Sequence, residues 1–277
     1  SKDQPNIVYA SALRSGDSRG GIWPAEPIDL YKSTDAGETW KIVGACLTCS
    51  AIENIIVMDG DPDFLWVASD GGLQFTKDGG RTFSGNVIPY LDEVGQDKQK
   101  INEEGPPKVI GLALQPNNPD TMLAASANNG MFRSTDGGKT WVRSNTGLTS
   151  SKLHHVDFAI SNPDVAYVTT HEGIFRTDDA GKSWTERSNG LTYKFVTPIA
   201  IDPRNEDVVF VGTATEVYTT HPRHKNRGMH RGEGLYKTID GGKNWIHSDK
   251  GVYEAKIAQI GNHPLIPFNI WVGGESG

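Results

Sequence analysis

The sequence has little of several features that mark particular classes of protein. No run of about eighteen apolar residues occurs, and the first residues, SKDQPN, are polar, so we expect neither a membrane span nor a signal peptide within these 277 residues. The formal net charge is −7, and the basic residues are scattered rather than grouped in a stripe. Binding along a nucleic-acid backbone needs such a stripe, so we expect no nucleic-acid partner.

Cysteine is also scarce, because the chain has only Cys46 and Cys49, in the stretch GACLTCSA. A haem attachment needs His where Ser50 stands, a structural zinc site needs two further ligands, and a redox dithiol is expected at a helix N-terminus. The sequence offers none of these contexts, nor a phosphate-binding loop or a nucleophile elbow. We therefore expect a local disulfide or two free thiols without a chemical role, and neither a metal nor a cofactor.

Glycine, by contrast, is abundant, and eight of the 32 glycines lie in a motif that occurs five times. Each copy has Ser or Thr, then Asp two positions later, Gly two after that and an aromatic residue three further on. The copies are STDAGETW (33–40), TKDGGRTF (76–83), STDGGKTW (134–141), TDDAGKSW (177–184) and TIDGGKNW (238–245).

The motif has the chemistry of a tight turn. Its carboxylate can accept backbone N–H groups of its own loop, and glycine adopts the positive φ that other residues resist. We therefore predict a hairpin corner whose aromatic residue packs over the core of the next unit. The shared residues are Asp35, Gly37, Trp40, Asp78, Gly80, Phe83, Asp136, Gly138, Trp141, Asp179, Gly181, Trp184, Asp240, Gly242 and Trp245.

The segments around each corner predict a four-stranded antiparallel unit. A short apolar strand such as GMFR or GIFR precedes the corner, a β-branched strand such as VAYVTT or VVFVGT comes before it, and an inner strand such as HVDFAIS or PIAIDP comes first. Turns rich in Pro and Asp, such as SNPD and DPRNED, join the inner strand to the second. Such units at this spacing predict an all-β propeller, with a sandwich or a solenoid as the alternative.

The five motifs resemble the Asp-box, or BNR, repeat of sialidases, sortilin-type receptors, xyloglucan-degrading endoglucanases and photosystem II assembly-factor propellers. The resemblance covers nearly the whole chain and implies a β-propeller in which the Asp-box is a structural corner away from the active face. It identifies the chain as a non-sialidase member, because the Arg-Ile-Pro element of sialidases is not found and no local motif selects three converging arginines. The family label alone says little about activity.

Counting strands indicates an incomplete ring. Three strands precede Cys46, four full sets follow, and two more come last, a total that four does not divide. We expect about five to six blades here, out of six or seven in the complete ring. Residues 1–277 are then a single propeller domain or part of a longer one, and a further segment or chain completes it.

The longest insertions predict which face carries function. The intervals between successive motif Asp residues are 43, 58, 43 and 61 residues, and the extra length falls in residues 84–107 and 214–233, with a third insertion at 11–27. All three connect strands at the end opposite the Asp-boxes, and long loops on a rigid scaffold are where binding usually occurs. The candidate binding residues of this face are Arg14, Arg19, Trp23, His171, His221, Arg223, His224, Arg227, His230 and Arg231.

Two further groups of residues have alternative readings. The adjacent His154 and His155 lie in a predicted inner strand, where we expect core or channel histidines. In the xyloglucanase-like reading, Asp70 in ASDGGLQF would be a catalytic carboxylate, with Glu172 or Glu275 at equivalent turns as its partner. The same Asp70 also fits an ordinary hairpin turn.

We therefore predict a non-catalytic propeller module that presents its loop-rich face to a protein or glycan partner. The alternative is a glycoside hydrolase-like domain with paired carboxylates, so the enzyme question stays open at this point. The chain begins with Ser rather than Met, which fits a processed export precursor and predicts an extracellular or periplasmic location.

Overall fold

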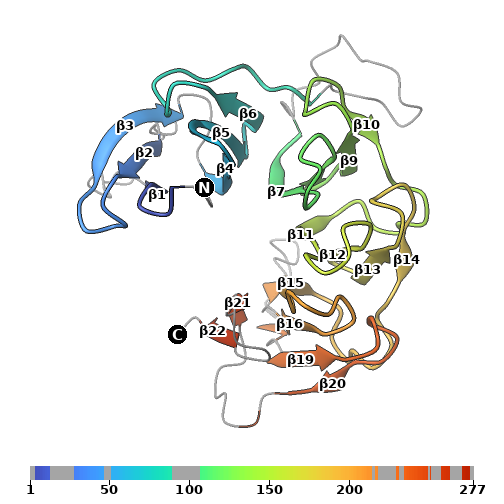
Figure 1. Ribbon diagram of the computed structural model, residues 1–277. Coiled ribbons are helices and arrows are strands. Elements are labelled where there is room, and N and C mark those ends of the chain that lie inside the picture. The colour runs from blue at the N-terminus through green and yellow to red at the C-terminus, as the bar shows by residue number, and fades with distance from the viewer. Residues whose placement is uncertain are drawn as a thin grey trace, which may run out of the picture. The chain divides into compact units, whose positions relative to one another are not determined.

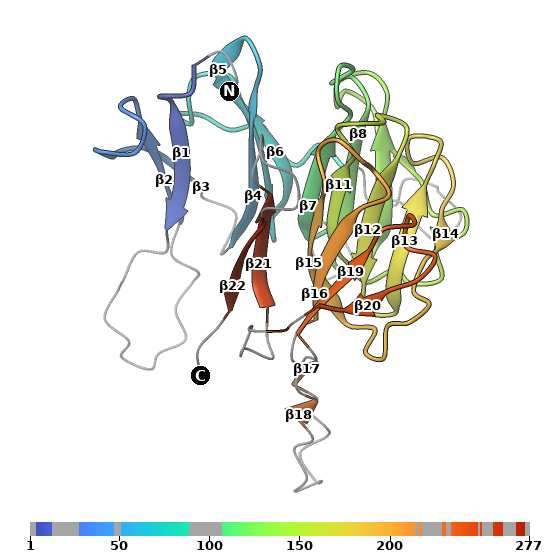
Figure 2. The ribbon, with the colours of Figure 1, turned by 60° about the horizontal axis from the view of Figure 1, so that its bottom comes forward.

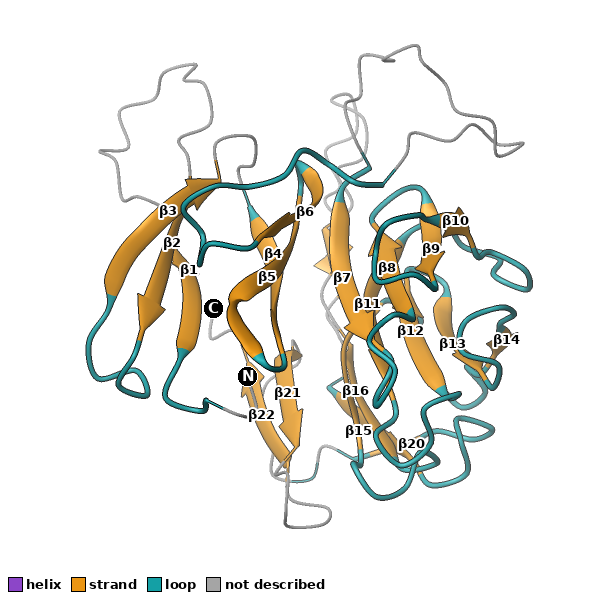
Figure 3. Cartoon of the chain, turned by 45° about the horizontal axis from the view of Figure 1, so that its top comes forward, coloured by secondary structure: helices purple, strands orange, loops and turns teal. Residues whose placement is uncertain are grey.

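The computed structural model consists of strands and connecting loops (Figure 3). It describes residues 4–12, 28–46, 51–88, 107–213, 216–217, 229–230, 234–248, 250, 257–262 and 270–274. This part of the chain contains strands and no helix, which confirms the all-β prediction. The chain divides into two compact units, one of Ser1–Leu112 with Gly138–Trp141 and one of Ala113–Gly137 with Val142–Gly277. Each is described by itself.

The first unit contains two three-stranded antiparallel sheets in which consecutive strands are neighbours (Figure 1). One sheet is β1 (Val8–Ala12), β2 (Ile28–Ser33) and β3 (Lys41–Cys46), and the other is β4 (Ile52–Met58), β5 (Asp61–Ser69) and β6 (Gly72–Thr76).

The second of these sheets lacks the regular fourth strand that we predicted. The segment after the Asp-box still runs beside β6, where Val87 donates its backbone N–H to the carbonyl of Leu73 at 2.9 Å. Side chains replace the other ladder acceptors, because Ser84 Oγ accepts the N–H of Phe75 and Asn86 Oδ1 accepts that of Leu73. The backbone therefore follows β6 without forming a continuous ladder.

Three four-stranded antiparallel sheets follow along the chain, as the repeat predicts. Figure 2 shows the strands of one of them, β11 to β14, side by side. The sheets are β7 (Val109–Leu114), β8 (Met122–Ser126), β9 (Gly130–Ser134) and β10 (Val142–Arg143); β11 (Leu153–Phe158), β12 (Ala166–Thr170), β13 (Gly173–Thr177) and β14 (Thr185–Glu186); and β15 (Val196–Ile201), β16 (Val209–Thr213), β19 (Leu235–Thr238) and β20 (Ile246–His247).

Two short pairs complete the described strands. β17 (Glu216–Val217) pairs with β18 (Met229–His230), and β21 (Ile257–Asn262) pairs with β22 (Ile270–Gly274). β21 lies beside β15, which in turn lies beside β11, so the first strands of successive sheets are neighbours in the second unit.

The hydrophobic core lies between successive sheets. β8, β12 and β16 are buried at every position, and because side chains alternate between the two faces of a strand, both faces of these strands must be covered. Leu123 of β8 and Phe175 of β13 belong to one buried cluster, and Tyr167 of β12 and Val211 of β16 belong to the next. Each sheet is therefore held by its neighbours.

Glycine begins the third strand because another chain segment passes very close. A Cβ atom on Gly130 would lie 2.5 Å from Asn145 Oδ1, and one on Gly173 would lie 2.2 Å from Ser188 Oγ. Both glycines have positive φ, 78° and 126°. The approach allows Asn145 to accept the N–H of Met131 at 2.7 Å, so the segment after the two-residue fourth strand is fastened to the third.

Candidate functional site

The Asp-box motifs form the loops after the third strands, and their carboxylates accept hydrogen bonds from groups of the same loops. Asp179 accepts hydrogen bonds from the hydroxyls of Thr177 and Ser183, both at 2.6 Å, and from the backbone N–H of Ser183 at 2.9 Å. The Thr177 hydroxyl in turn accepts the N–H of Gly181 at 2.9 Å. Burial raises the pKa of Asp179, but hydrogen bonds from Ser183 and Thr177 outweigh it and hold the pKa at about 2.

The other boxes repeat this arrangement. Hydrogen bonds from Ser33 and Thr39 lower the pKa of Asp35 to about 2, and those from Asn244 and Thr238 lower that of Asp240 to about 2. The pKa of Asp78 is lowered by hydrogen bonds from Thr82 and Thr76, and Asp136 accepts from Ser134 Oγ at 2.8 Å. The Asp-box is therefore a structural joint, in agreement with its turn chemistry.

The aromatic latch of the joint differs from our prediction in its direction. Trp184 donates its indole N–H to the carbonyl of Ser144 at 3.0 Å, and its backbone N–H to that of Thr146 at 2.8 Å. Both acceptors belong to the repeat before that of Trp184. Trp245 does the same one repeat later, because its indole N–H is accepted by the carbonyl of Arg187 in the repeat before its own. The expectation that the aromatic packs over the next unit was wrong, because the fourth strand begins beside the segment that leaves the preceding sheet.

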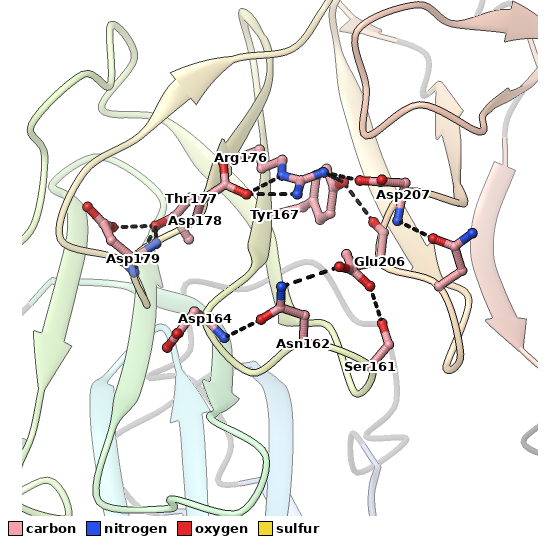
Figure 4. A network of polar contacts seen from close by, with 12 residues as sticks. Ser161, Asn162, Asp164, Tyr167, Arg176, Thr177, Asp178, Asp179, Glu206 and Asp207 are labelled. Carbon is pink, nitrogen blue, oxygen red and sulfur yellow. Dashed lines mark hydrogen bonds and ion pairs between the residues drawn. The ribbon is translucent and has the colours of Figure 1, made fainter.

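A polar network fastens neighbouring sheets at the Asp-box end (Figure 4). Arg176, one residue before Thr177, donates to Asp207 at 2.5 Å and to the hydroxyl of Tyr167 at 2.9 Å, and Tyr167 donates to the carbonyl of Glu206 at 2.8 Å. Burial raises the pKa of Tyr167, so the phenol stays protonated.

The first unit has the same joint with different residues. Tyr9 donates to the carbonyl of Pro62 at 3.0 Å, and Lys32 lies 2.6 Å from Asp63. Tyr9 therefore corresponds to Tyr167, Lys32 to Arg176 and Asp63 to Asp207. The correspondence makes β1 the second strand of its sheet, not the first.

At the opposite end of the second unit, three ring side chains form a cluster. The rings of His154 and His171 stack with centroids 4.6 Å apart, and the Phe195 ring stands edge-on to both at 4.8 and 4.6 Å. His154 lies near the start of β11, where Leu153 pairs with Thr170 at the end of β12. The cluster therefore lies at the strand ends away from the Asp-boxes, which is where we predicted the binding face.

A β-bulge places His154 in this cluster. The register of β11 shifts between Leu153 and His155, so His154 is the extra residue, and bulges commonly redirect a side chain. The sequence predicted core or channel histidines here but not the contact with His171, and it did not single out Phe195. A register shift also occurs near the start of β4, β15 and β21, and no sequence pattern predicted it.

Burial keeps the imidazole of His154 neutral at pH 7. Desolvation, together with the nearby His171, lowers its pKa to about 4, and desolvation also lowers the pKa of His155. His154 Nε2 is buried and has no hydrogen-bond partner within the described residues. His154 therefore contributes a partly buried, neutral ring to the cluster.

The candidate catalytic carboxylates lie in two different units. Asp70 follows β5 in the first unit, where its carboxylate accepts the N–H of Ala51 at 3.0 Å and its own N–H donates to the Ala51 carbonyl. Glu172 is exposed in the turn between β12 and β13 of the second unit, and its N–H donates to Thr170 Oγ1 at 2.9 Å. Both are placed at the turn from second to third strand, as expected, and Asp70 has a clear structural role there.

The remaining predicted site residues cannot be placed as side chains. His230 lies in β18 and Cys46 in β3, whose side chains at these positions are not described. Outside the described residues lie Arg14, Arg19, Trp23, Cys49, His221, Arg223, His224, Arg227, Arg231 and Glu275.

Two features are absent from the described ranges of the chain. No group of three or more His, Cys, Asp or Glu side chains in these ranges is arranged to hold a metal ion. Across the same ranges, no helix has the length and apolar character needed to span a bilayer.

Comparison with known proteins agrees with this architecture. A family model described as Sortilin, neurotensin receptor 3, matches residues 129–266, just under half of the chain. No curated protein matches the sequence significantly. An ancestral GH74 enzyme has a similar structure (TM-score 0.66, 20% identity, 95% of this chain and 32% of that chain), as has the GH74 xyloglucanase from Xanthomonas campestris (0.65, 16%, 98% and 42%).

A third similar structure is YCF48 bound to D1 peptide, with a TM-score of 0.50 and 17% identity over 84% of this chain and 64% of that chain. This chain spans less than half the length of the GH74 chains. At such identities the likeness concerns the fold and not the activity. The repeated Asp-box corners, the four-stranded antiparallel sheets and these matches show that the chain has the fold of the Asp-box (BNR) repeat β-propellers.

Proposed function

We propose that this chain is a non-catalytic binding module that receives a protein or glycan partner on the face opposite its Asp-boxes. The observation behind the proposal is the cluster of His154, His171 and Phe195 at that end of the second unit. Each of the three side chains is partly exposed, and ring side chains supply contact area with little loss of conformational entropy.

The Asp-box end supports the proposal by contrast. Its acidic groups are engaged in their own loops, and its Tyr and Arg side chains fasten one sheet to the next. YCF48, a similar structure, is recorded bound to D1 peptide, so the fold accommodates a polypeptide ligand in at least one protein. A peptide partner is therefore the first to test, and a glycan the second.

The test compares a variant on each face. Binding to a peptide library and to a glycan array would be measured for the wild type, for His171→Ala and for the matched control Lys182→Ala on an exposed Asp-box loop residue. We expect His171→Ala to weaken binding about tenfold, as expected for removal of a ring contact of about 1.4 kcal/mol, and the control to leave it unchanged. Equal effects of the two variants would contradict the proposal.

A glycoside hydrolase is the second candidate, because Asp70 and Glu172 occupy equivalent turns after second strands and GH74 enzymes have similar structures. Hydrolysis needs one protonated and one ionised carboxyl about 5–10 Å apart. The discriminating assay measures release of reducing ends from xyloglucan and related glucans. Activity that Asp70→Asn or Glu172→Gln abolishes would establish the enzyme and overturn the binding-module proposal.

A further inference from the structure

Arg133 and Arg176 occupy the same position in neighbouring sheets but differ in their partners. Each is the fourth residue of its third strand, in GMFRS of β9 and in GIFRT of β13. Arg176 reaches two carboxylates, with Nη1 2.5 Å from Asp207 Oδ1 and Nη2 2.7 Å from Asp178 Oδ1 (Figure 4). Arg133 donates its Nε–H to the carbonyl of Ala180 at 2.8 Å, and within the described residues its two Nη groups make no hydrogen bond or ion pair.

A single methyl group accounts for this difference. A Cβ atom on Gly241 would lie 2.2 Å from Arg176 Nη1 and 2.7 Å from Asp207 Oδ1, so that ion pair needs a glycine beside it. At the corresponding position the preceding Asp-box has Ala180, whose methyl group takes the space that such a pair needs. Asp164, the counterpart of Asp207 in that repeat, instead accepts a hydrogen bond from a side-chain amide at 3.3 Å. The arginine of β9 is therefore held through its Nε alone.

The side chains that flank Arg133 differ in exposure. Arg133 faces Leu123 on one neighbouring strand and Val142 on the other, so these three side chains share one face of the sheet. A Cβ atom on Gly181 would lie 2.4 Å from Leu123 Cδ2, so this face packs against the Asp-box of the next sheet. Leu123 is buried, Arg133 is half-buried and Val142 is 59% exposed. The guanidinium therefore lies between a buried apolar contact and an exposed apolar side chain.

We propose that the two Nη groups of Arg133 bind a carboxylate side chain of a partner polypeptide at the Asp-box end of the second unit. A guanidinium offers two parallel N–H donors that match the two oxygens of a carboxylate, and such charge-assisted pairs are stronger than neutral hydrogen bonds. Val142 offers an apolar contact beside the charge, which favours an acidic residue next to an apolar one over a polyhydroxyl glycan. The site lies at the end opposite the ring cluster, so the inference does not depend on the proposed partner face.

The electrostatics of the two arginines agree with this assignment. Burial lowers the pKa of Arg133, and the nearby charge of Asp179 opposes that effect without overcoming it. The Asp179 carboxylate already accepts the hydroxyls of Ser183 and Thr177 in its own loop. At Arg176 burial also lowers the pKa, but hydrogen bonds to two carboxylates outweigh it and raise the pKa. A partner carboxylate would thus give Arg133 the kind of contact that the chain itself gives Arg176.

Selection from a random decapeptide display library tests the proposal without knowledge of the partner. The library would be selected on the wild-type chain and depleted on Arg133→Gln, which keeps a polar side chain but removes the charge, and circular dichroism checks that the variant is folded. We expect the enriched peptides to carry Asp or Glu next to an apolar residue. No enrichment over the variant, or enrichment of peptides without an acidic residue, would overturn the proposal. Binding of polygalacturonate alone, lost in Arg133→Gln, would make an acidic glycan the ligand and also refute it.

A charge cycle across the contact locates the bound carboxylate. Affinity for the most enriched peptide would be measured by fluorescence anisotropy. We expect Arg133→Gln, and replacement of the peptide's acidic residue by its amide, each to weaken binding about tenfold, and the two changes together to cost no more than either alone. Arg133→Lys should restore part of the affinity, because it keeps the charge but lacks the planar fork.

The matched control is Arg187→Gln. Arg187 is likewise half-buried, and its Nε has no hydrogen-bond partner within the described residues. We expect this variant to change affinity by less than about twofold, because its guanidinium is not part of the proposed contact. Additive losses in the charge cycle, or an equal loss in the control, would show that the peptide binds elsewhere.

Ala180→Gly tests the role of the methyl group. Its removal should let Arg133 pair with Asp164 as Arg176 pairs with Asp207, so the internal carboxylate competes and peptide binding should weaken about threefold. Ala180 has a φ of 56°, which glycine adopts without strain, so the variant should fold. Adding Asp164→Asn to Ala180→Gly should restore binding. Unchanged affinity in Ala180→Gly would contradict the proposal.

Discussion

The sheets β11–β14 and β1–β3 share an Asp-box and a joint to the next sheet, yet their second strands differ in burial. Tyr167 and Arg176 hold one sheet to its neighbour, and Tyr9 and Lys32 do the same for the other. The inner strand β11 covers β12, whereas β1 has exposed residues along its length. The same joint at the Asp-box end therefore forms in both sheets, although their second strands differ in exposure.

The largest expected difference concerns the tryptophan of each box. Trp184 is 4% exposed and bonds to the preceding repeat, while Trp40 is 40% exposed and donates to Gly37 of its own loop. Trp184→Ala should lower the free energy of unfolding by about 4 kcal/mol and Trp40→Ala by about 1 kcal/mol. Urea denaturation followed by circular dichroism measures both losses. Equal losses would contradict the expected difference between the sheets β11–β14 and β1–β3.

The carboxylate of the box should have the next largest effect. Asp179→Asn removes charge-assisted hydrogen bonds to Ser183 and Thr177, which we expect to cost about 2 kcal/mol at pH 7. Asp35→Asn should cost less, because that loop is exposed.

A pH series checks the origin of this loss. The folded pKa of Asp179 is about 2, below the unfolded value of about 3.9, so its contribution is present above pH 4 and is lost as the pH falls toward 2. Urea midpoints of Asp179→Asn should therefore approach those of the wild type at pH 2. A constant difference down to that pH would assign the loss to packing.

The joints should show a smaller effect. A double-mutant cycle of Arg176→Met and Asp207→Ala should give a coupling free energy of about 1 kcal/mol, since Arg176 is largely buried and Asp207 is half exposed. The corresponding cycle of Lys32→Met and Asp63→Ala should give less, because a single ammonium group makes the contact. A stronger coupling in the first unit would show that the sheet β1–β3 depends more on its joint than the sheet β11–β14 does.

The smallest effect concerns a residue of β11, the strand for which β1–β3 has no counterpart among its described strands. The folded pKa of His154 is about 4, below the unfolded value of about 6.5, so the unfolded state binds more protons between these values. Stability should therefore be fully present above pH 6.5 and decline as the pH falls toward 4. His154→Gln should flatten this decline in urea midpoints, and an imidazole that titrates near 6.5 by NMR would contradict the account.

Residue order alone predicted much of the fold and the end of the sheet at which His171 lies, whereas its role in binding stays a prediction. The repetition of Asp, Gly and an aromatic residue located all five corners, and the placement of His171 at the end away from them followed from counting strands. The sequence could not predict which repeat Trp184 packs against. The motif gives the spacing of residues along the chain, but not which neighbouring segment lies beside the indole. The irregular fourth strand after β6 was missed for a related reason, since Ser84 and Asn86 supply side-chain acceptors in place of a ladder.

The sequence by itself determined the repeat unit, because turn chemistry and strand patterning depend on residues only a few positions apart. Only the tertiary structure decided that His154 leaves the ladder at a bulge to stack on His171, and that Val8 stays exposed where Ala166 is covered. Both outcomes depend on contacts between residues distant in sequence. Such contacts are set by packing and strand pairing, which no local pattern specifies.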